Sequence, residues 1–139
     1  GVTGLLRQTP GSIGYVELTY ARQDKLACAA LRNAEGAFVA PDLQSTRAAV
    51  AGAAAALRRD IRASVVNAPG KAAYPISGLT YILLYQQQAD ARRAQALTAF
   101  LQWASHEGQQ AAEALDYAPL PAALVDANDA ALQRVTPGK

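Results

Sequence analysis

The sequence predicts an α/β fold, and three observations support this prediction. Two apolar segments of β-type composition, residues 10–17 and 74–85, each begin with turn residues. Both faces of the stretch from Ile13 to Tyr20 are largely apolar, as in a strand inside an α/β sheet. After Asp90, apolar residues recur three and four positions apart as far as Gly108, which predicts an amphipathic helix.

Length and composition restrict the class of protein. The 139 residues suffice for one domain with a real core, and 51% hydrophobic with 17% charged residues is typical of globular proteins. The 13 basic and 11 acidic side chains are scattered, which argues against a nucleic-acid partner. The sequence contains no stretch of eighteen consecutive apolar residues, so no membrane span is predicted. The first residues lack the features of a signal peptide, so we expect a secreted form to appear here already processed or truncated.

The first half of the chain alternates between predicted helices and strands. Residues 2–8 predict a short helix, and residues 13–20 predict a buried strand. Residues 26–31 fit either a strand or a helical turn, and residues 33–36 form a turn signal. Asp42 is a good N-cap for a helix through the alanine run to Leu57, and so many alanines favour close packing on a flat partner.

The second half begins with an ambiguous segment, residues 58–66, which fits either a continued helix or an extended chain. Residues 67–70 then break the chain, and Tyr74-Pro75 is a suitable entry to a strand because the residue before proline prefers extended geometry. This strand runs to Tyr85. Three helices follow, over residues 90–107, 109–115 and 121–135.

The residues that could carry catalytic chemistry are few. His106, the only histidine, lies near the carboxyl end of the helix over residues 90–107, where a structural role suits it. The single cysteine, Cys28, is predicted to be a small buried hydrophobe. These two residues provide neither a metal-ligand cluster nor a catalytic triad. We therefore expect no enzyme activity, no metal and no cofactor.

Carboxylates and glycines give no further site. Glu113 with Asp116, and Asp126 with Asp129, are interpreted as solvated surface pairs. The glycines near residues 11–14 and 77–78 lead into or lie within predicted strands, whereas a phosphate-binding loop needs a glycine-rich connection between a strand and a helix.

Aromatic residues are interpreted as packing groups rather than ligand contacts. Five of the six tyrosines lie in or beside the two predicted strands, and Trp103 is predicted to pack its helix on a sheet. The tyrosines in question are Tyr15, Tyr20, Tyr74, Tyr81 and Tyr85.

Several motifs, taken in order, resemble the carboxyl-terminal part of the periplasmic phosphate-binding protein family, the solute receptors of the high-affinity phosphate ABC transporter. The combination of the first motif with the last is the specific part of the resemblance. The motifs are Pro10-Gly11-Ser12-Ile13-Gly14-Tyr15-Val16-Glu17, Tyr20-Ala21, Asn33-Ala34-Glu35-Gly36, Tyr74-Pro75-Ile76-Ser77, Phe100-Leu101-Gln102-Trp103-Ala104 and Leu115-Asp116-Tyr117-Ala118-Pro119-Leu120-Pro121.

This resemblance implies part of a two-lobed type II periplasmic-binding-protein fold, with mixed sheets flanked by helices and a hinge motion that closes over phosphate. Residues 1–72 would end the second lobe, and residues 73–139 would return into the first. Each lobe is incomplete in this chain, so unpaired sheet edges and exposed apolar faces are expected. The expected partners are inorganic phosphate, the missing amino-terminal part of the receptor and the membrane subunits of an ABC importer, in the periplasm.

The resemblance implies no phosphate ligand within this chain. The family's Arg, Asp and Gly-Ser-Gly-Thr-like loop belong to sequence that precedes the first motif, so no phosphate contact is transferred. Tyr15, Ser77 and Thr80 are expected to lie near the hinge. Two alternatives stay open: a self-sufficient α/β module that binds a protein partner through the helices over residues 42–57 and 90–107, and a receptor for sulfate or molybdate.

Overall fold

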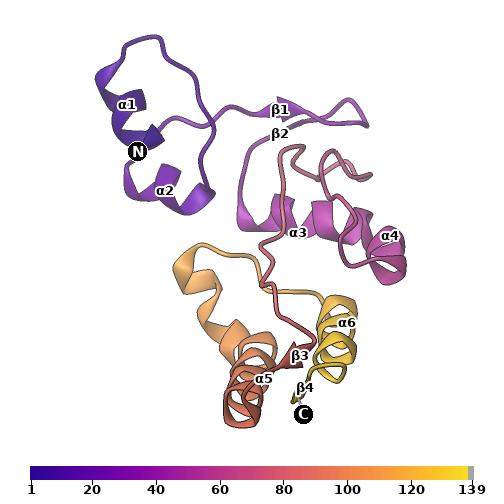
Figure 1. Ribbon diagram of the computed structural model, residues 1–139. Coiled ribbons are helices and arrows are strands. Elements are labelled where there is room, and N and C mark those ends of the chain that lie inside the picture. Colours follow the sequence, from indigo (N-terminus) through magenta and orange to yellow (C-terminus); the bar gives the residue numbers. More distant parts are fainter. Residues whose placement is uncertain (138–139) are drawn as a thin grey trace.

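The computed structural model describes residues 1–137 and consists mainly of short helices. The first half contains a helical pair, a small antiparallel hairpin and a second helical pair (Figure 1). These elements are α1 (Val2–Gln8), α2 (Leu18–Gln23), β1 (Leu31–Arg32), β2 (Phe38–Val39), α3 (Leu43–Gly52) and α4 (Ala54–Arg59).

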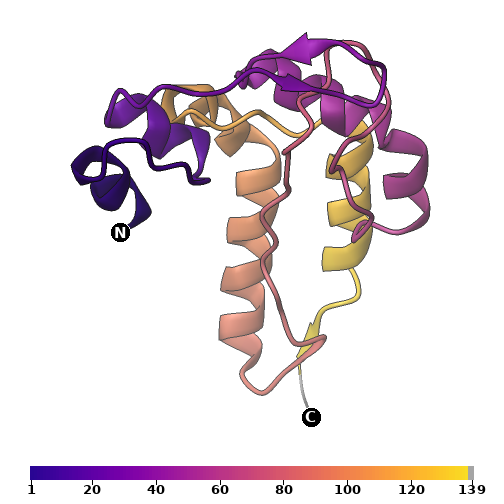
Figure 2. The same ribbon diagram turned by 90° about the horizontal axis from the view of Figure 1, so that it is seen from above.

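The second half is built around two long helices. A long extended segment leads from the first half down between α5 and α6 to a small parallel sheet, where Gln87 lies opposite Thr136 (Figures 1 and 2). These elements are β3 (Gln87–Gln88), α5 (Ala91–Ser105), the 3₁₀ helices η1 (Glu107–Ala111) and η2 (Glu113–Leu115), α6 (Ala122–Leu132) and β4 (Thr136–Pro137). None of the helices within residues 1–137 is long and apolar enough to cross a membrane.

Helix α3 starts where the sequence predicts it. The Asp42 carboxylate accepts a hydrogen bond from the Ser45 backbone N–H at 2.6 Å, and the Ser45 hydroxyl accepts one from the Asp42 N–H at 2.9 Å. This reciprocal pair satisfies two backbone donors that a helix start leaves free. The predicted single helix over residues 42–57 is divided at Ala53, where the backbone leaves helical geometry before α4 begins.

Small residues let this helical pair pack closely, as the alanine run predicts. Gly52 is the clearest case, because a Cβ at this position would lie 1.9 Å from the carbonyl oxygen of Pro69. The core centres on α3 and α4 and includes one buried leucine of α6, so residues on both sides of position 72 share it. Its buried members are Ala49, Val50, Ala53, Leu57, Val65, Ala68, Ala73 and Leu124.

Asn33 anchors the hairpin to this core. Its side-chain amide donates to the carbonyl oxygens of Gly70, Lys71 and Ala73, and its side-chain oxygen accepts from two backbone N–H groups of its own turn. The Glu35 carboxylate adds a contact by accepting from the Gly70 N–H at 2.8 Å. The predicted turn over residues 33–36 is confirmed, with Gly36 at φ 81° supplying the left-handed position that glycine tolerates.

The prediction of a buried strand over residues 13–20 is wrong. The chain is extended from Ser12 to Glu17, but Ile13 is 96% exposed, and α2 begins at Leu18. Within residues 1–137, no main-chain hydrogen bond involves residues 13–16. A β-strand needs a neighbouring strand for its backbone groups, and the described residues provide none here.

The predicted strand through Tyr85 is likewise unpaired within the described residues. Residues 76–85 are extended, yet their main-chain groups form no hydrogen bond with other main-chain groups of residues 1–137. Leu83 is 92% exposed, and Ile82 and Tyr85 are exposed as well. The unpaired edge and exposed apolar face expected for an incomplete lobe are therefore present.

Other predictions need smaller corrections. Residues 26–30 lead into β1, which begins at Leu31, so the strand alternative holds only at the end of that segment. Helix α4 ends at Arg59, and the expected helix over residues 109–115 is a pair of 3₁₀ helices. Cys28 is exposed rather than buried, because its segment is covered by no other element. Trp103 is 54% exposed and faces the Phe100 ring, at 5.9 Å between ring centroids, instead of a sheet. The tyrosines also pack less than expected, since only Tyr74 of the five in question is half-buried and the rest are exposed.

Candidate functional site

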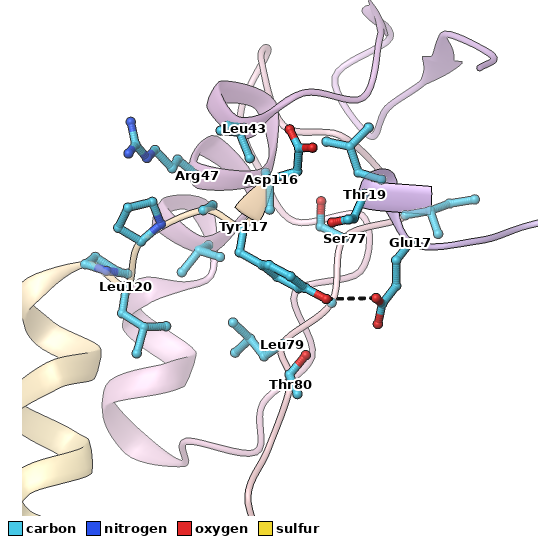
Figure 3. A pocket seen from close by; sticks show the side chains of 18 of the residues that line it. Glu17, Thr19, Leu43, Arg47, Ser77, Leu79, Thr80, Asp116, Tyr117 and Leu120 are labelled. Atoms are coloured by element: carbon cyan, nitrogen blue, oxygen red, sulfur yellow. Dashed lines mark hydrogen bonds between the residues drawn. The ribbon is translucent and has the colours of Figure 1, made fainter. Parts of the chain in front are cut away.

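A pocket of about 960 Å³ lies where the two halves of the chain meet, and we call it the junction pocket. Four stretches line it: the segment leading into α2, one side of α3, the start of the extended segment over residues 74–85, which we call the crossing segment, and the loop after η2 (Figure 3). Its lining residues lie within 15–19, 43–51, 76–80 and 116–121.

The three residues expected near the hinge, Tyr15, Ser77 and Thr80, all line the junction pocket. Ser77 is buried, and its hydroxyl donates to the Tyr74 carbonyl oxygen at 2.9 Å, which fixes the turn after Pro75. Tyr15 and Thr80 are exposed at the pocket's edges. The Tyr74 N–H donates to the Ser45 carbonyl oxygen at 3.2 Å, so α3 holds the start of the crossing segment.

The charges around the junction pocket do not favour an anion. Its lining includes the carboxylates of Glu17 and Asp116 and one guanidinium, that of Arg47. Arg47 forms an ion pair with Glu113, and Asp116 forms one with Arg22. Arg47 and Asp116 are thus both neutralised by partners. Glu17 is the lining charge without an ion pair within residues 1–137, and a carboxylate repels phosphate. Glu113 is exposed, as expected of a surface charge, whereas Asp116 is half-buried, and each has a distant ion-pair partner that the sequence did not indicate.

Tyr117 closes one side of the pocket. Its hydroxyl donates to the Glu17 carboxylate at 2.9 Å, a contact that joins residues one hundred positions apart (Figure 3). This hydrogen bond to a carboxylate raises the pKa of Tyr117, because ionising the phenol would place two negative charges side by side. The phenol therefore remains a donor at neutral pH.

A second pocket, about 550 Å³, lies between α5, α6 and residues 80–86, and we call it the interhelix groove. Its lining is mostly apolar and includes Leu84, Leu101 and Leu132. Thr80 lines both pockets, so the crossing segment connects the junction pocket to the groove. The groove lies beside an extended segment whose backbone is unpaired within residues 1–137, and its apolar lining offers little to a small ion.

His106 has the structural role that its position predicts. It caps the end of α5, and its Nε2 lies 3.0 Å from the Asp129 carboxylate on α6. Asp129 is therefore not the purely solvated charge that was expected. Contacts of this kind tie the two long helices together and leave His106 outside both pockets.

Comparison with known proteins decides the family. The model of the PBP superfamily domain matches residues 1–107. The chain belongs to the PBP superfamily. It is 42% identical over 125 residues to the phosphate-binding protein PstS of Xylella fastidiosa strain 9a5c, an alignment that covers 90% of this chain and 34% of that protein.

Two further relatives carry the same name. The phosphate-binding protein PstS of Haemophilus influenzae is 38% identical over 125 residues, covering 90% of this chain and 37% of that protein. The protein of that name from Methanocaldococcus jannaschii is 34% identical over 121 residues, covering 79% of this chain and 31% of that protein. The chain thus spans 31% to 37% of the length of these relatives.

These findings confirm the resemblance inferred from the motifs and the partial α/β periplasmic-binding-protein fold that it implies. A self-sufficient interaction module is not favoured, because the matched relatives are named for phosphate binding and are much longer than this chain.

Sequence reasoning missed the residues that link the halves across the junction pocket. These are Glu17, Thr19, Arg22, Arg47 and Glu113, whose partners lie 66 to 100 residues away in the chain. Local spacing carries no information about such distant pairs. The one available signal was Asp116-Tyr117 within the last motif, since two polar side chains just before Pro119 and Pro121 suggest a loop with a specific partner.

Proposed function

We propose that residues 1–139 form part of an extracytoplasmic receptor that binds inorganic phosphate and delivers it to an ABC importer. The observation that carries this proposal is 42% identity to a phosphate-binding protein PstS over 90% of the chain. The receptor works in the periplasm, binds without catalysis, and docks onto the importer's membrane subunits.

Within this receptor, residues 1–72 end the second lobe and residues 73–139 return into the first. The exposed segment over residues 76–85 and the interhelix groove support this arrangement, because both require further polypeptide to cover them. The amino-terminal part of the same receptor is the partner that supplies it. Tyr15, Ser77 and Thr80 lie at the crossing between the lobes.

Phosphate is held by residues outside this chain. The junction pocket supports this view because its guanidinium is ion-paired and its other charged lining groups are carboxylates. Residues 1–139 therefore provide scaffold and crossing, while the cations and hydroxyls that recognise the anion come from the remaining two thirds of the receptor.

Isothermal titration with phosphate, sulfate and molybdate tests the proposal on two samples, the complete polypeptide and residues 1–139 alone. We expect the complete polypeptide to bind phosphate and to discriminate against sulfate, and residues 1–139 to bind neither. Preference for sulfate or molybdate would reassign the ligand. Phosphate binding by residues 1–139 as tight as that of the complete polypeptide would contradict the placement of the site.

A further inference from the structure

Four polar contacts join the first half of the chain to the loop between α5 and α6. The Tyr117 hydroxyl donates to Glu17 at 2.9 Å, and the Thr19 hydroxyl donates to the Leu115 carbonyl oxygen at 3.2 Å. Two ion pairs, Arg22 with Asp116 and Arg47 with Glu113, complete the set. We call these contacts the latch; each one crosses from residues 1–72 to residues 73–139.

The loop side of the latch is held in a tight shape of its own. Asp116 has φ 62° and ψ 27°, a left-handed conformation that few non-glycine residues adopt. The Asp116 N–H donates to the Glu113 carbonyl oxygen at 3.0 Å, and the Tyr117 N–H to that of Ala112 at 2.9 Å. These bonds close the turn, so its polar groups reach the first half as one unit rather than as independent side chains.

The latch lies apart from the apolar contact between the halves. Leu124 of α6 packs among the core residues of α4, whereas the latch contacts α2, the segment before it and α3. Apolar packing is non-directional and permits rotation about the contact. Hydrogen bonds also hold the crossing segment to the first half, from the Tyr74 N–H to the Ser45 carbonyl oxygen and from the Tyr81 hydroxyl to the Ile61 carbonyl oxygen. Hydrogen bonds and ion pairs depend on direction and distance, so the latch, as a second set of them at a separate place, fixes the angle between the halves.

From this geometry we propose that Glu17, Thr19, Arg22 and Arg47 are positioning residues that set the angle between the halves through the loop over residues 113–117. They touch no phosphate. By restricting rotation before the anion arrives, they reduce the conformational freedom that binding must remove, and so they tighten phosphate binding. This inference rests on the proposed function of the complete receptor.

The test uses the complete polypeptide carrying Arg22→Ala with Arg47→Ala, and compares it with Arg58→Ala with Arg59→Ala. The control removes the same charge from arginines that form no ion pair within residues 1–137. Exposed ion pairs are individually weak, so we expect the Kd for phosphate to rise about threefold to tenfold over the control. Exchanging the charges, Arg47→Glu with Glu113→Arg, should recover most of the loss caused by Arg47→Glu alone.

Two readouts separate positioning from simple stabilisation. Salt of about 0.5 M should weaken binding by the natural sequence more than binding by the Arg22→Ala, Arg47→Ala variant, because screening removes only contacts that are still present. A spin label on the exposed Cys28, paired with one on Gln95→Cys of α5, should show a broader distance distribution in that variant than in the control.

The outcomes distinguish this inference from the proposed function. For the Arg22→Ala, Arg47→Ala variant, a Kd within about twofold of that of the control, or a lower one, together with an unchanged distance distribution would contradict the role proposed for the latch. If the natural sequence binds no phosphate at all, the proposed function fails, and the width of the distance distribution still decides whether the latch sets the angle.

Discussion

Residues 42–73 and residues 76–85 are both rich in apolar side chains, but their surroundings differ. In the first region Leu57 is 2% exposed and packs in the core, and the polar groups of its turns are paired. In the second region Leu83 is 92% exposed and the main chain is unpaired within residues 1–137. Apolar composition thus indicates that a segment is suited to burial. Whether it is buried depends on which other elements are present to pack against it.

The strongest test of this difference replaces one leucine by alanine in each region of the complete receptor. Leu57→Ala should lower the free energy of unfolding by about 2–5 kcal/mol, because it leaves a cavity in the core. Leu83→Ala should cost a similar amount despite its exposure here, since we propose that other parts of the receptor cover it. Urea unfolding measures both. A change below about 0.5 kcal/mol for Leu83→Ala would mean that this face meets solvent in the receptor.

A substitution at Asn33 tests the hydrogen bonds that hold the hairpin to the packed region. Asn33→Ala removes a donor shared by three carbonyl oxygens and an acceptor for two N–H groups, so we expect a loss of about 2–3 kcal/mol. Asn128→Ala is the matched control, because its amide makes one long contact, 3.4 Å to the Ser105 hydroxyl. Equal thermal stabilities of the two variants would show that the hairpin is not anchored through Asn33.

The smallest effect concerns the start of α3. Asp42→Ala should cost about 1 kcal/mol at neutral pH, while Asp126→Ala, in the exposed middle of α6, should cost much less. The hydrogen bond from the Ser45 N–H lowers the pKa of Asp42 below its ordinary value of 3.8. The stabilisation of the fold by the Asp42 carboxylate is therefore complete above pH 3.8 and is lost as the pH falls through the lower pKa of the folded state. Unfolding curves that keep the Asp42→Ala difference constant down to pH 2 would contradict this assignment.

The sequence predicted elements whose causes are local. Asp42 and Asp90 are N-caps in the structure as their spacing indicated, and the turn at residues 33–36 forms as its residues suggest. Strand pairing is not local, so Ile13 and Leu83 could be recognised as β-type residues but not given a partner. The latch could not be predicted from the sequence either, because nothing near Arg47 indicates Glu113, and only folding brings the two residues together.

Native-state hydrogen exchange of the complete receptor tests the central claim most directly, namely that residues 76–85 form a strand paired with polypeptide outside this chain. The account predicts that amides from Leu79 to Tyr85 exchange as slowly as those of α3, since both would be hydrogen-bonded in a core element. Fast exchange of residues 79–85 in a receptor whose α3 amides are protected would contradict it.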